Sequence, residues 1–221
     1  LHSVMSYVLA TSLLVNLVAA AVAALLVARR GGAPWLLVRL RLRPAPRIDY
    51  AAIAAQRFAE ETETGGTIWW GDSLAQNAPL LRALADTRNW GIGGQVVADL
   101  AEWSDQVISA QPERLVIIAG TNDLGMGREV GATLAALGDL LADLRRGLPD
   151  AHISVAALPP LRHVATGAVE AFNAGLPSVA ATSGCEVLQG LANPERDWTD
   201  DGTHFTRAAY LRQLGVRASQ P

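Results

Sequence analysis

Cysteine is almost absent from this chain of 221 residues, since Cys185 is its only example. One thiol cannot form an internal disulfide, and it cannot supply a thiolate-rich metal site. The cysteine count leaves the redox compartment open.

At this length we expect one ordinary domain with an appendage, because a domain of about 170 residues buries roughly 70% of its unfolded surface.

Acidic residues are absent from residues 1–47, and the same segment contains six arginines. Because the whole chain has a formal net charge of −3, these six positive charges leave a net charge of −9 on residues 48–221. Domains that bind nucleic acid present a basic surface that neutralises phosphates. The acidic remainder therefore argues against a nucleic-acid partner.

Charged side chains are also absent from residues 4–28, which are almost wholly apolar. At ~1.5 Å per residue, a helix of this length crosses a hydrocarbon layer of ~30 Å. A cleaved signal peptide is the competing interpretation, but the basic n-region is missing, and Leu26 occupies the −3 position of the only plausible site, after Ala28. We therefore expect residues 1–28 to form an uncleaved, single-pass membrane anchor.

The segment at residues 29–49 is basic and contains prolines. Tryptophan and alternating arginines suit the headgroup layer of a membrane, and Pro44 and Pro46 mark a linker. A basic linker without lipid contact is the alternative. Because the arginines follow the apolar span, the positive-inside rule places the next domain, expected at residues 50–221, on the cytoplasmic face.

Apolar strand patterns alternate with helical patterns through residues 50–221. This alternation predicts a parallel, doubly wound sheet of the α/β class. We expect four tryptophans of this region, Trp69, Trp70, Trp90 and Trp103, to pack in its core. Strands are predicted at 67–70, shortly before 89, at 114–119, 153–158 and 185–188, and helices at 50–60, through 74–84, at 96–107, 130–148 and 169–181.

The stretch from Thr67 to Leu74 predicts a strand that ends in a tight turn containing a serine. Ligands of an open α/β sheet lie outside the carboxyl ends of its strands, so Ser73 is a candidate nucleophile facing the crevice. The alternative is that Asp72 or Ser73 only caps the next helix. The G-x-S-x-G elbow is absent, because Ala75 occupies the position of its second glycine.

His204 is the best candidate for a catalytic base. Asp201 lies three residues before it, and an acid at this spacing can hydrogen-bond the imidazole and fix its tautomer. Asp200 is the neighbouring alternative, although the spacing favours Asp201. A serine needs such a base, because its hydroxyl is a poor nucleophile near neutral pH.

Four short blocks carry a resemblance to a known family: Gly71–Leu74, Asn89–Gly94, Gly120–Asp123 and Asp201–His204. In order and approximate spacing they resemble the sequence blocks of the SGNH, or GDSL, hydrolases. The resemblance covers about residues 65–214. It implies a three-layer α/β/α sandwich with a flavodoxin-like sheet, and a serine esterase that uses no metal or other cofactor.

The resemblance also implies a role for each matching residue. Ser73 would attack the ester carbonyl, His204 would take the serine proton, and Asp201 would orient His204. The oxyanion would be held by the backbone N–H groups of Ser73 and Gly94 and by the side-chain amide of Asn122.

The second block departs from the family, because Gly93-Gly94-Gln95 replaces the more usual Ser-Gly-Asp. The matched glycine remains while the pocket wall changes, which affects the expected substrate preference more than catalysis. We expect Asp72 and Asp123 to hold loops through backbone hydrogen bonds. Phe205, next to the candidate base, is expected to line the acyl pocket.

These observations predict a membrane-anchored serine hydrolase that forms an acyl-enzyme on Ser73. Its substrate would be a small-acyl ester, an acetyl ester or a lysophospholipid-like ester, supplied as a small molecule, a lipid or a glycan. One alternative is an acyltransferase that uses the same acyl-enzyme, and another is a non-catalytic, membrane-tethered binding domain. The family resemblance favours an extracytoplasmic domain and the arginines favour the cytoplasmic face, so the membrane side stays open.

Overall fold

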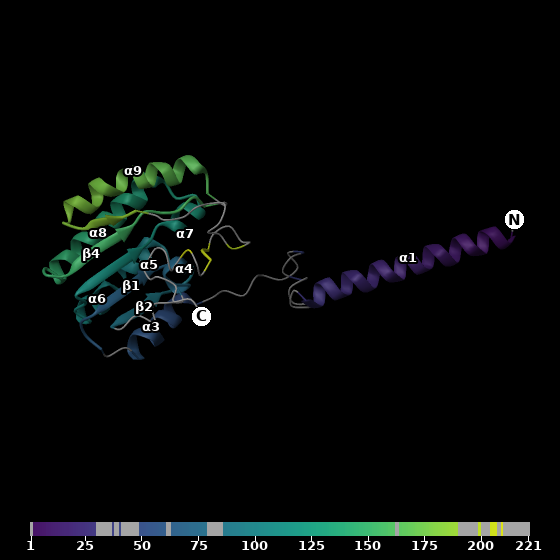
Figure 1. Ribbon diagram of the computed structural model, residues 1–221, viewed down its shortest axis with the longest axis horizontal. Helices are drawn as coiled ribbons and strands as arrows, with labels where there is room; N and C mark the ends of the chain where they lie inside the picture. Colours follow the sequence, from purple (N-terminus) through teal and green to yellow (C-terminus); the bar gives the residue numbers. More distant parts are fainter. Residues whose placement is uncertain are drawn as a thin grey trace, which may run out of the picture. The chain divides into compact units, whose positions relative to one another are not determined.

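The chain forms two compact units, Leu1–Ile48 and Asp49–Pro221. Figure 1 shows the computed structural model, in which helix α1 (His2–Arg29) belongs to the first unit and the sheet belongs to the second. The structure describes residues 2–29, 37, 40, 49–60, 63–78, 86–161, 164–189, 199, 204–206 and 209.

The second unit is built on a sheet of five strands in the order β2-β1-β3-β4-β5. All neighbouring strands are parallel, which confirms the predicted doubly wound, flavodoxin-like sheet. The chain moves from β1 to one side and then returns to the other, so the crevice at the carboxyl ends of β1 and β3 is the switch point where ligands bind in such folds. The strands are β1 (Thr67–Gly71), β2 (Thr87–Gly91), β3 (Arg114–Ile118), β4 (His152–Ala156) and β5 (Glu186–Leu188).

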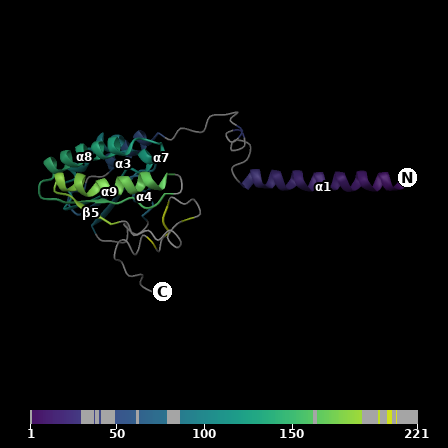
Figure 2. The same cartoon turned by 90° about the horizontal axis from the view of Figure 1, so that it is seen from above.

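Helices cover both faces of this sheet and complete the three layers. Buried residues of α3, α5, α6, α7, α8 and α9 share one core cluster, and buried residues of α4, together with Phe205 and Ala209, pack in the other. Helices α8 and α9 run side by side (Figure 2). Their bounds are α3 (Tyr50–Glu60), α4 (Ser73–Gln76), α5 (Val97–Ala101), α6 (Ser104–Ser109), α7 (Thr121–Gly125), α8 (Val130–Gly147) and α9 (Thr166–Thr182).

Strand β1 contributes to both cores, because successive side chains of a strand point to opposite faces. Ile68 and Trp70 belong to the cluster under α3 and α8, whereas Trp69 belongs to the cluster under α4. Trp70 and Trp90 are almost fully buried, so the tryptophans at the strand ends are core residues, as predicted.

The helix predicted across residues 96–107 is wrong, because two short helices, α5 and α6, occupy this segment. The N–H of Trp103 donates to the backbone oxygen of Leu100 at 2.9 Å, three residues back, and the hydroxyl of Ser104 donates to the backbone oxygen of Ala101 at 3.0 Å. Both contacts compete with the four-residue ladder of an α-helix. The break lets the Trp103 ring pack against Phe58, with ring centroids 5.1 Å apart.

The helical stripe predicted through 74–84 is only partly visible. Helix α4 ends at Gln76, with Asn77 as its C-cap. Residues 79–85 lie outside the described residues.

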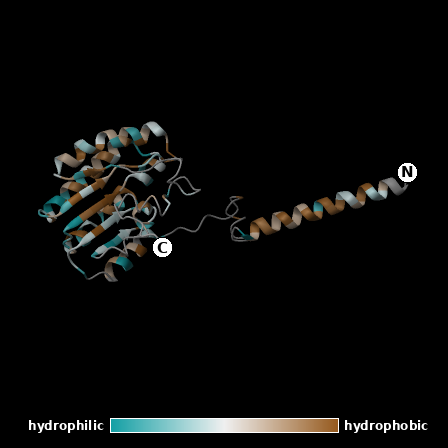
Figure 3. Ribbon diagram, viewed as in Figure 1, coloured by the Kyte–Doolittle hydropathy of each residue, from teal (hydrophilic) through white to brown (hydrophobic). Residues whose placement is uncertain are grey.

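Helix α1 is 28 residues long, and its side chains are exposed from Met5 onward except for the half-exposed Val27. Hydrophobic residues occupy most of its length (Figure 3). By length and composition, the segment Met5–Arg29 is able to cross a membrane, and both a membrane anchor and a signal sequence have these properties.

Candidate active site

Ser73 lies at the carboxyl end of the central strand β1. Gly71 ends the strand at φ +143°, and a Cβ placed on it would lie 1.9 Å from the backbone oxygen of Ile118 on β3, so only glycine fits between the strands. Asp72 then caps α4, because its Oδ1 accepts from the N–H of Leu74 at 2.8 Å. The capping role falls to Asp72, and the hydroxyl of Ser73 makes a different contact.

That contact joins two residues 131 positions apart in the chain. Nε2 of His204 lies 2.8 Å from Oγ of Ser73, and both side chains are half-buried. The backbone oxygen of His204 accepts from the N–H of Thr199 at 2.8 Å and from its hydroxyl at 3.1 Å, which joins the two ends of the segment 199–204. Asp201 belongs to this segment and lies outside the described residues.

The glycine-rich turn after β2 is fastened to the helix that carries Ser73. Gln76, at the end of α4, accepts the N–H of Gly93 on its Oε1 at 2.6 Å. The side-chain amide of Asn89 donates to the oxygens of Ala75 and Gln76 at 2.9 and 3.2 Å. Sequence reasoning missed Gln76, whose signal is its spacing of one helical turn from Ser73.

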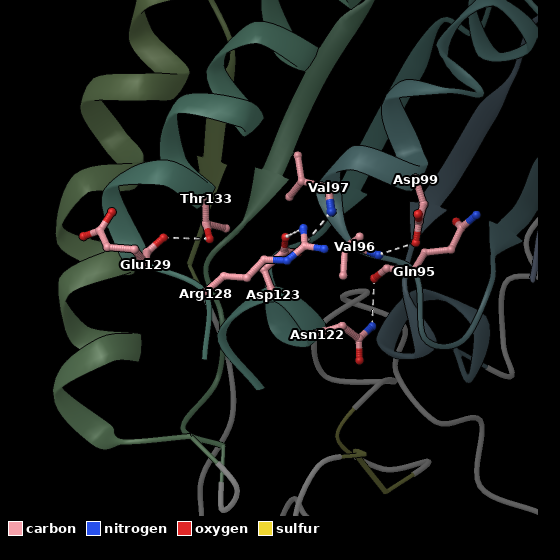
Figure 4. Close-up of polar contacts among 9 residues, drawn as sticks. All are labelled: Gln95, Val96, Val97, Asp99, Asn122, Asp123, Arg128, Glu129 and Thr133. Atoms are coloured by element: carbon pink, nitrogen blue, oxygen red, sulfur yellow. Dashed lines mark hydrogen bonds and ion pairs between the residues drawn. The ribbon is translucent and has the colours of Figure 1, made fainter. Parts of the chain in front are cut away.

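Asn122 lies in the first turn of α7, at the carboxyl end of β3. Its Nδ2 donates to the backbone oxygen of Gln95 at 2.8 Å (Figure 4). A side-chain amide carries two N–H groups, so the second remains for a ligand. The contact holds Asn122 against the residue that follows Gly94, and four of the predicted residues, Ser73, His204, Gly94 and Asn122, thus lie at the same edge of the sheet.

Asp123 holds two loops together, as expected. Its Oδ2 accepts from the N–H of Val97 at 3.0 Å, and its Oδ1 pairs with Nη1 of Arg128 at 2.9 Å (Figure 4). The Asp123 side chain is buried and that of Arg128 is about half exposed. The carboxylate therefore connects the start of α5 to α7 with its charge paired.

Asp72 is fully buried, and no arginine among the described residues forms an ion pair with its carboxylate. Burial raises the pKa of this carboxyl from 3.8 to about 6, and the N–H of Leu74, the Thr121 hydroxyl and His204 offset part of the rise. The Thr121 hydroxyl is near the carboxyl, although neither it nor Oδ2 of Asp72 has a well-aligned hydrogen bond in the described part of the chain. Ionisation of Asp72, the residue that precedes Ser73, therefore destabilises the folded state.

Phe205 is buried beneath α4 and packs in one cluster with Trp69 and Leu74. Its role at an acyl pocket stays a prediction. Within the described ranges, no group of three or more His, Cys, Asp or Glu side chains is placed to hold a metal ion.

Taken as chemistry, the arrangement pairs a hydroxyl with an imidazole at hydrogen-bond distance, which is the geometry of an activated nucleophile. The glycine-rich turn lies close to Ser73, since a Cβ placed on Gly93 would lie 3.7 Å from Cβ of Ser73, and the neutral Asn122 amide is hydrogen-bonded to the same turn. Donors held in this way stabilise negative charge that develops on an oxygen.

Comparisons with known proteins agree with this geometry. The model of the GDSL-like Lipase/Acylhydrolase family matches residues 52–212. No curated protein matches the chain.

Three solved structures share the fold at low sequence identity. A protein from Streptococcus pneumonia, whose name relates it to platelet activating factor, has a TM-score of 0.67 and 20% identity over 76% of this chain and 91% of its own. A Clostridium thermocellum family 3 carbohydrate esterase has a TM-score of 0.58 and 16% identity over 69% and 93%. The psychrotrophic esterase EstA from Pseudoalteromonas sp. has a TM-score of 0.57 and 15% identity over 70% and 94%.

Proposed function

Because the chain belongs to the GDSL-like lipase/acylhydrolase family, we propose that it is a serine esterase that cleaves a small-acyl carboxylic ester through an acyl-enzyme on Ser73. The observation that carries this proposal is the 2.8 Å contact between Oγ of Ser73 and Nε2 of His204. That distance lies within the range in which an imidazole accepts a serine proton.

In the proposed mechanism, Oγ of Ser73 forms a bond to the ester carbonyl carbon while its proton passes to Nε2 of His204. The tetrahedral intermediate then breaks its bond to the alcohol oxygen, and His204 gives the proton to the leaving alcohol. Water repeats the sequence on the acyl-enzyme and releases the acid and free Ser73. Asp201 orients His204 through both steps.

The oxyanion of the intermediate is proposed to bind the N–H groups of Ser73 and Gly94 and the second N–H of Asn122. Support comes from the contact of the first Asn122 N–H with the Gln95 oxygen, because it fixes the orientation of the amide. A donor held before the reaction begins needs no reorganisation as charge develops, and losing one such donor costs about 10²- to 10³-fold in rate.

Short connections between strands and helices at the candidate site support a small acyl group. One residue separates β1 from α4, and two residues separate β3 from α7. No inserted helix covers Ser73 in the described part of the chain. Long-chain lipases need extended apolar surface for their substrates, so we propose an acetyl or similarly short acyl ester on a small alcohol, a glycan or a lysophospholipid-like carrier.

The proposed domain arrangement is a membrane anchor at residues 1–28, a basic juxtamembrane linker at 29–49 and the hydrolase domain at 50–221. The length and apolar composition of α1 support the anchor. Full-length protein that stays with membranes after alkaline carbonate extraction, at its uncleaved mass, is the expected result. Release of a shorter, soluble form would instead identify a signal sequence.

Labelling with a fluorophosphonate tests the proposed nucleophile. Wild-type protein should be labelled and Ser73→Ala should not, whereas Ser178→Ala, at an exposed serine of α9, should be labelled like wild type. Absence of labelling in folded wild-type protein contradicts the proposal and favours a binding domain. Product analysis with and without added alcohol then separates hydrolysis from acyl transfer, because only transfer yields a new ester.

A further inference from the structure

Helix α3 precedes the sheet in the chain and packs beside the glycine-rich turn of the candidate site. The family model begins at residue 52, so Tyr50, the first residue of α3, lies ahead of the matched region. Tyr50, Ala54, Arg57 and Phe58 follow the spacing of one helical face. This face packs inward, since Ala54 is fully buried and Phe58 contacts the Trp90 ring, with centroids 4.9 Å apart.

Arg57 binds the outer border of the sheet. β2 is the edge strand of the sheet formed by the described residues, so the backbone groups of Asn89 and Gly91 on its outer side face no other strand of that sheet. Nη1 of Arg57 donates to the oxygen of Asn89 at 3.1 Å and to that of Gly91 at 2.8 Å. The Asn89 side chain accepts the N–H of Gly91 at 2.9 Å. Arg57 therefore holds the strand up to the residue where the glycine-rich turn begins.

Tyr50 contacts the turn itself. Gly94 has φ +82°, and a Cβ placed on it would lie 2.3 Å from Cζ of Tyr50 and 2.5 Å from its hydroxyl oxygen. The aromatic ring therefore lies against Cα of Gly94. Without this contact the turn could adopt several conformations, because glycine has many accessible backbone conformations.

We propose that Tyr50 and Arg57 are positioning residues, through which α3 holds Gly94 so that its N–H points at the oxyanion. The proposal rests on the esterase function proposed above. The turn is held on one side by Gln76 of α4 and on the other by α3. Both supports are needed, because catalytic donors must be held to about 0.5 Å.

The proposal predicts a separation between binding and chemistry. The Gly94 N–H acts on charge that exists only in the transition state, so loosening the turn lowers kcat and leaves KM nearly unchanged. Ring atoms Cζ and Cε2 of Tyr50 lie as close to Gly94 as its hydroxyl oxygen does, so phenylalanine should keep most of the positioning contact.

The test uses the full-length protein and p-nitrophenyl acetate. Tyr50→Ala should lower kcat about 10- to 100-fold with KM within about 2-fold, since a misplacement near 1 Å costs up to about 10²-fold. Tyr50→Phe should restore kcat to within about 2-fold of wild type. Arg57→Met, which keeps the apolar stem, should lower kcat about 10-fold. Ile53→Ala, on the exposed side of α3, is the matched control and should leave both constants unchanged.

Melting curves and fluorophosphonate labelling accompany each variant. If Tyr50→Ala does not fold, Tyr50→Leu, which keeps an apolar contact with the core, takes its place. Unchanged kcat in the folded variant overturns the positioning proposal, and so does an equal loss in Tyr50→Phe, which would make the hydroxyl itself a donor. Wild-type protein that is neither labelled nor active contradicts the esterase function instead, so the two failures are distinguishable.

Discussion

The turn after β1 and the turn after β3 are similar: a glycine at positive φ, Gly71 or Gly120, lies at or just beyond the end of the strand, and a buried aspartate follows near the start of a helix. Asp123 pairs with the guanidinium of Arg128, whereas one oxygen of Asp72 has no well-aligned hydrogen bond from any residue that the structure describes. Burial accordingly raises the pKa of Asp72 to about 6. The comparison teaches that two buried aspartates in turns at the same edge of the sheet can differ in the cost of their charge because of a single neighbour.

The two turns also differ in what they are proposed to contribute, and Ser73→Ala tests the first. Removing the hydroxyl of the β1 turn removes the proposed nucleophile, so kcat for p-nitrophenyl acetate should fall on the order of 10⁴-fold or more. Ser178→Ala should retain wild-type activity. A Ser73→Ala variant with more than a few per cent of wild-type activity would show that the β1 turn does not supply the nucleophile.

Asn122→Ala tests the contribution of the β3 turn. Losing one oxyanion donor should lower kcat about 10²- to 10³-fold while KM changes only a few-fold, because the amide acts on developing charge. Steady-state kinetics measure both constants. A rise in KM alone would mean that Asn122 binds the ester in its ground state.

Asp72→Asn tests the cost of the unpaired carboxylate. Because the pKa of Asp72 is raised from 3.8 to about 6 in the folded protein, the folded state holds this proton more tightly than the unfolded state between those values. The resulting stability is full below about pH 4 and is lost as the pH rises through 6. The free energy of unfolding of wild type should therefore fall by about 2 to 3 kcal/mol relative to Asp72→Asn between pH 4 and pH 7.

Denaturant titrations at several pH values measure this difference. Asp105→Asn, at an exposed carboxylate of α6, is the matched control, and its pH dependence of stability should follow that of wild type. A difference between wild type and Asp72→Asn that stays flat with pH would contradict the raised pKa.

Asp123→Asn should have the opposite effect at neutral pH. The amide oxygen can still accept from Val97, but the ion pair with Arg128 is lost, and that pair is partly screened because Arg128 is half exposed. We expect a loss of about 1 to 2 kcal/mol at pH 7, measured by the same titrations. An Asp123→Asn variant as stable as wild type would remove the contrast between the two turns.

Most of the sheet could be predicted because strand and helix patterns are local. The predicted helix at 50–60 matches α3, and the long stripe from Val130 matches α8. The break at Trp103 could not be predicted, since it depends on where Phe58 lies after folding. Local patterns identify elements, and tertiary contacts decide where an element is interrupted.

In the candidate site, too, some features could be predicted from the sequence and others depend on the fold. The four blocks located Ser73 and His204, although only the fold brings residues 131 positions apart to 2.8 Å. The contacts of Tyr50 and Arg57 with the glycine-rich turn left no sequence signal, because they depend on how α3 docks against the edge strand. The difference between Asp72 and Asp123 likewise depends on which of them Arg128 reaches.

The two hydrogen bonds from Arg57 to the outer carbonyls of β2 also concern association between molecules. An open strand border is a template on which another chain can add a strand, and such addition leads to domain exchange or fibres. With its carbonyls taken by a guanidinium and the N–H of Gly91 taken by Asn89, this border offers an incoming strand few groups to pair with. We therefore expect Arg57, besides its proposed positioning role, to hinder the addition of a strand along β2.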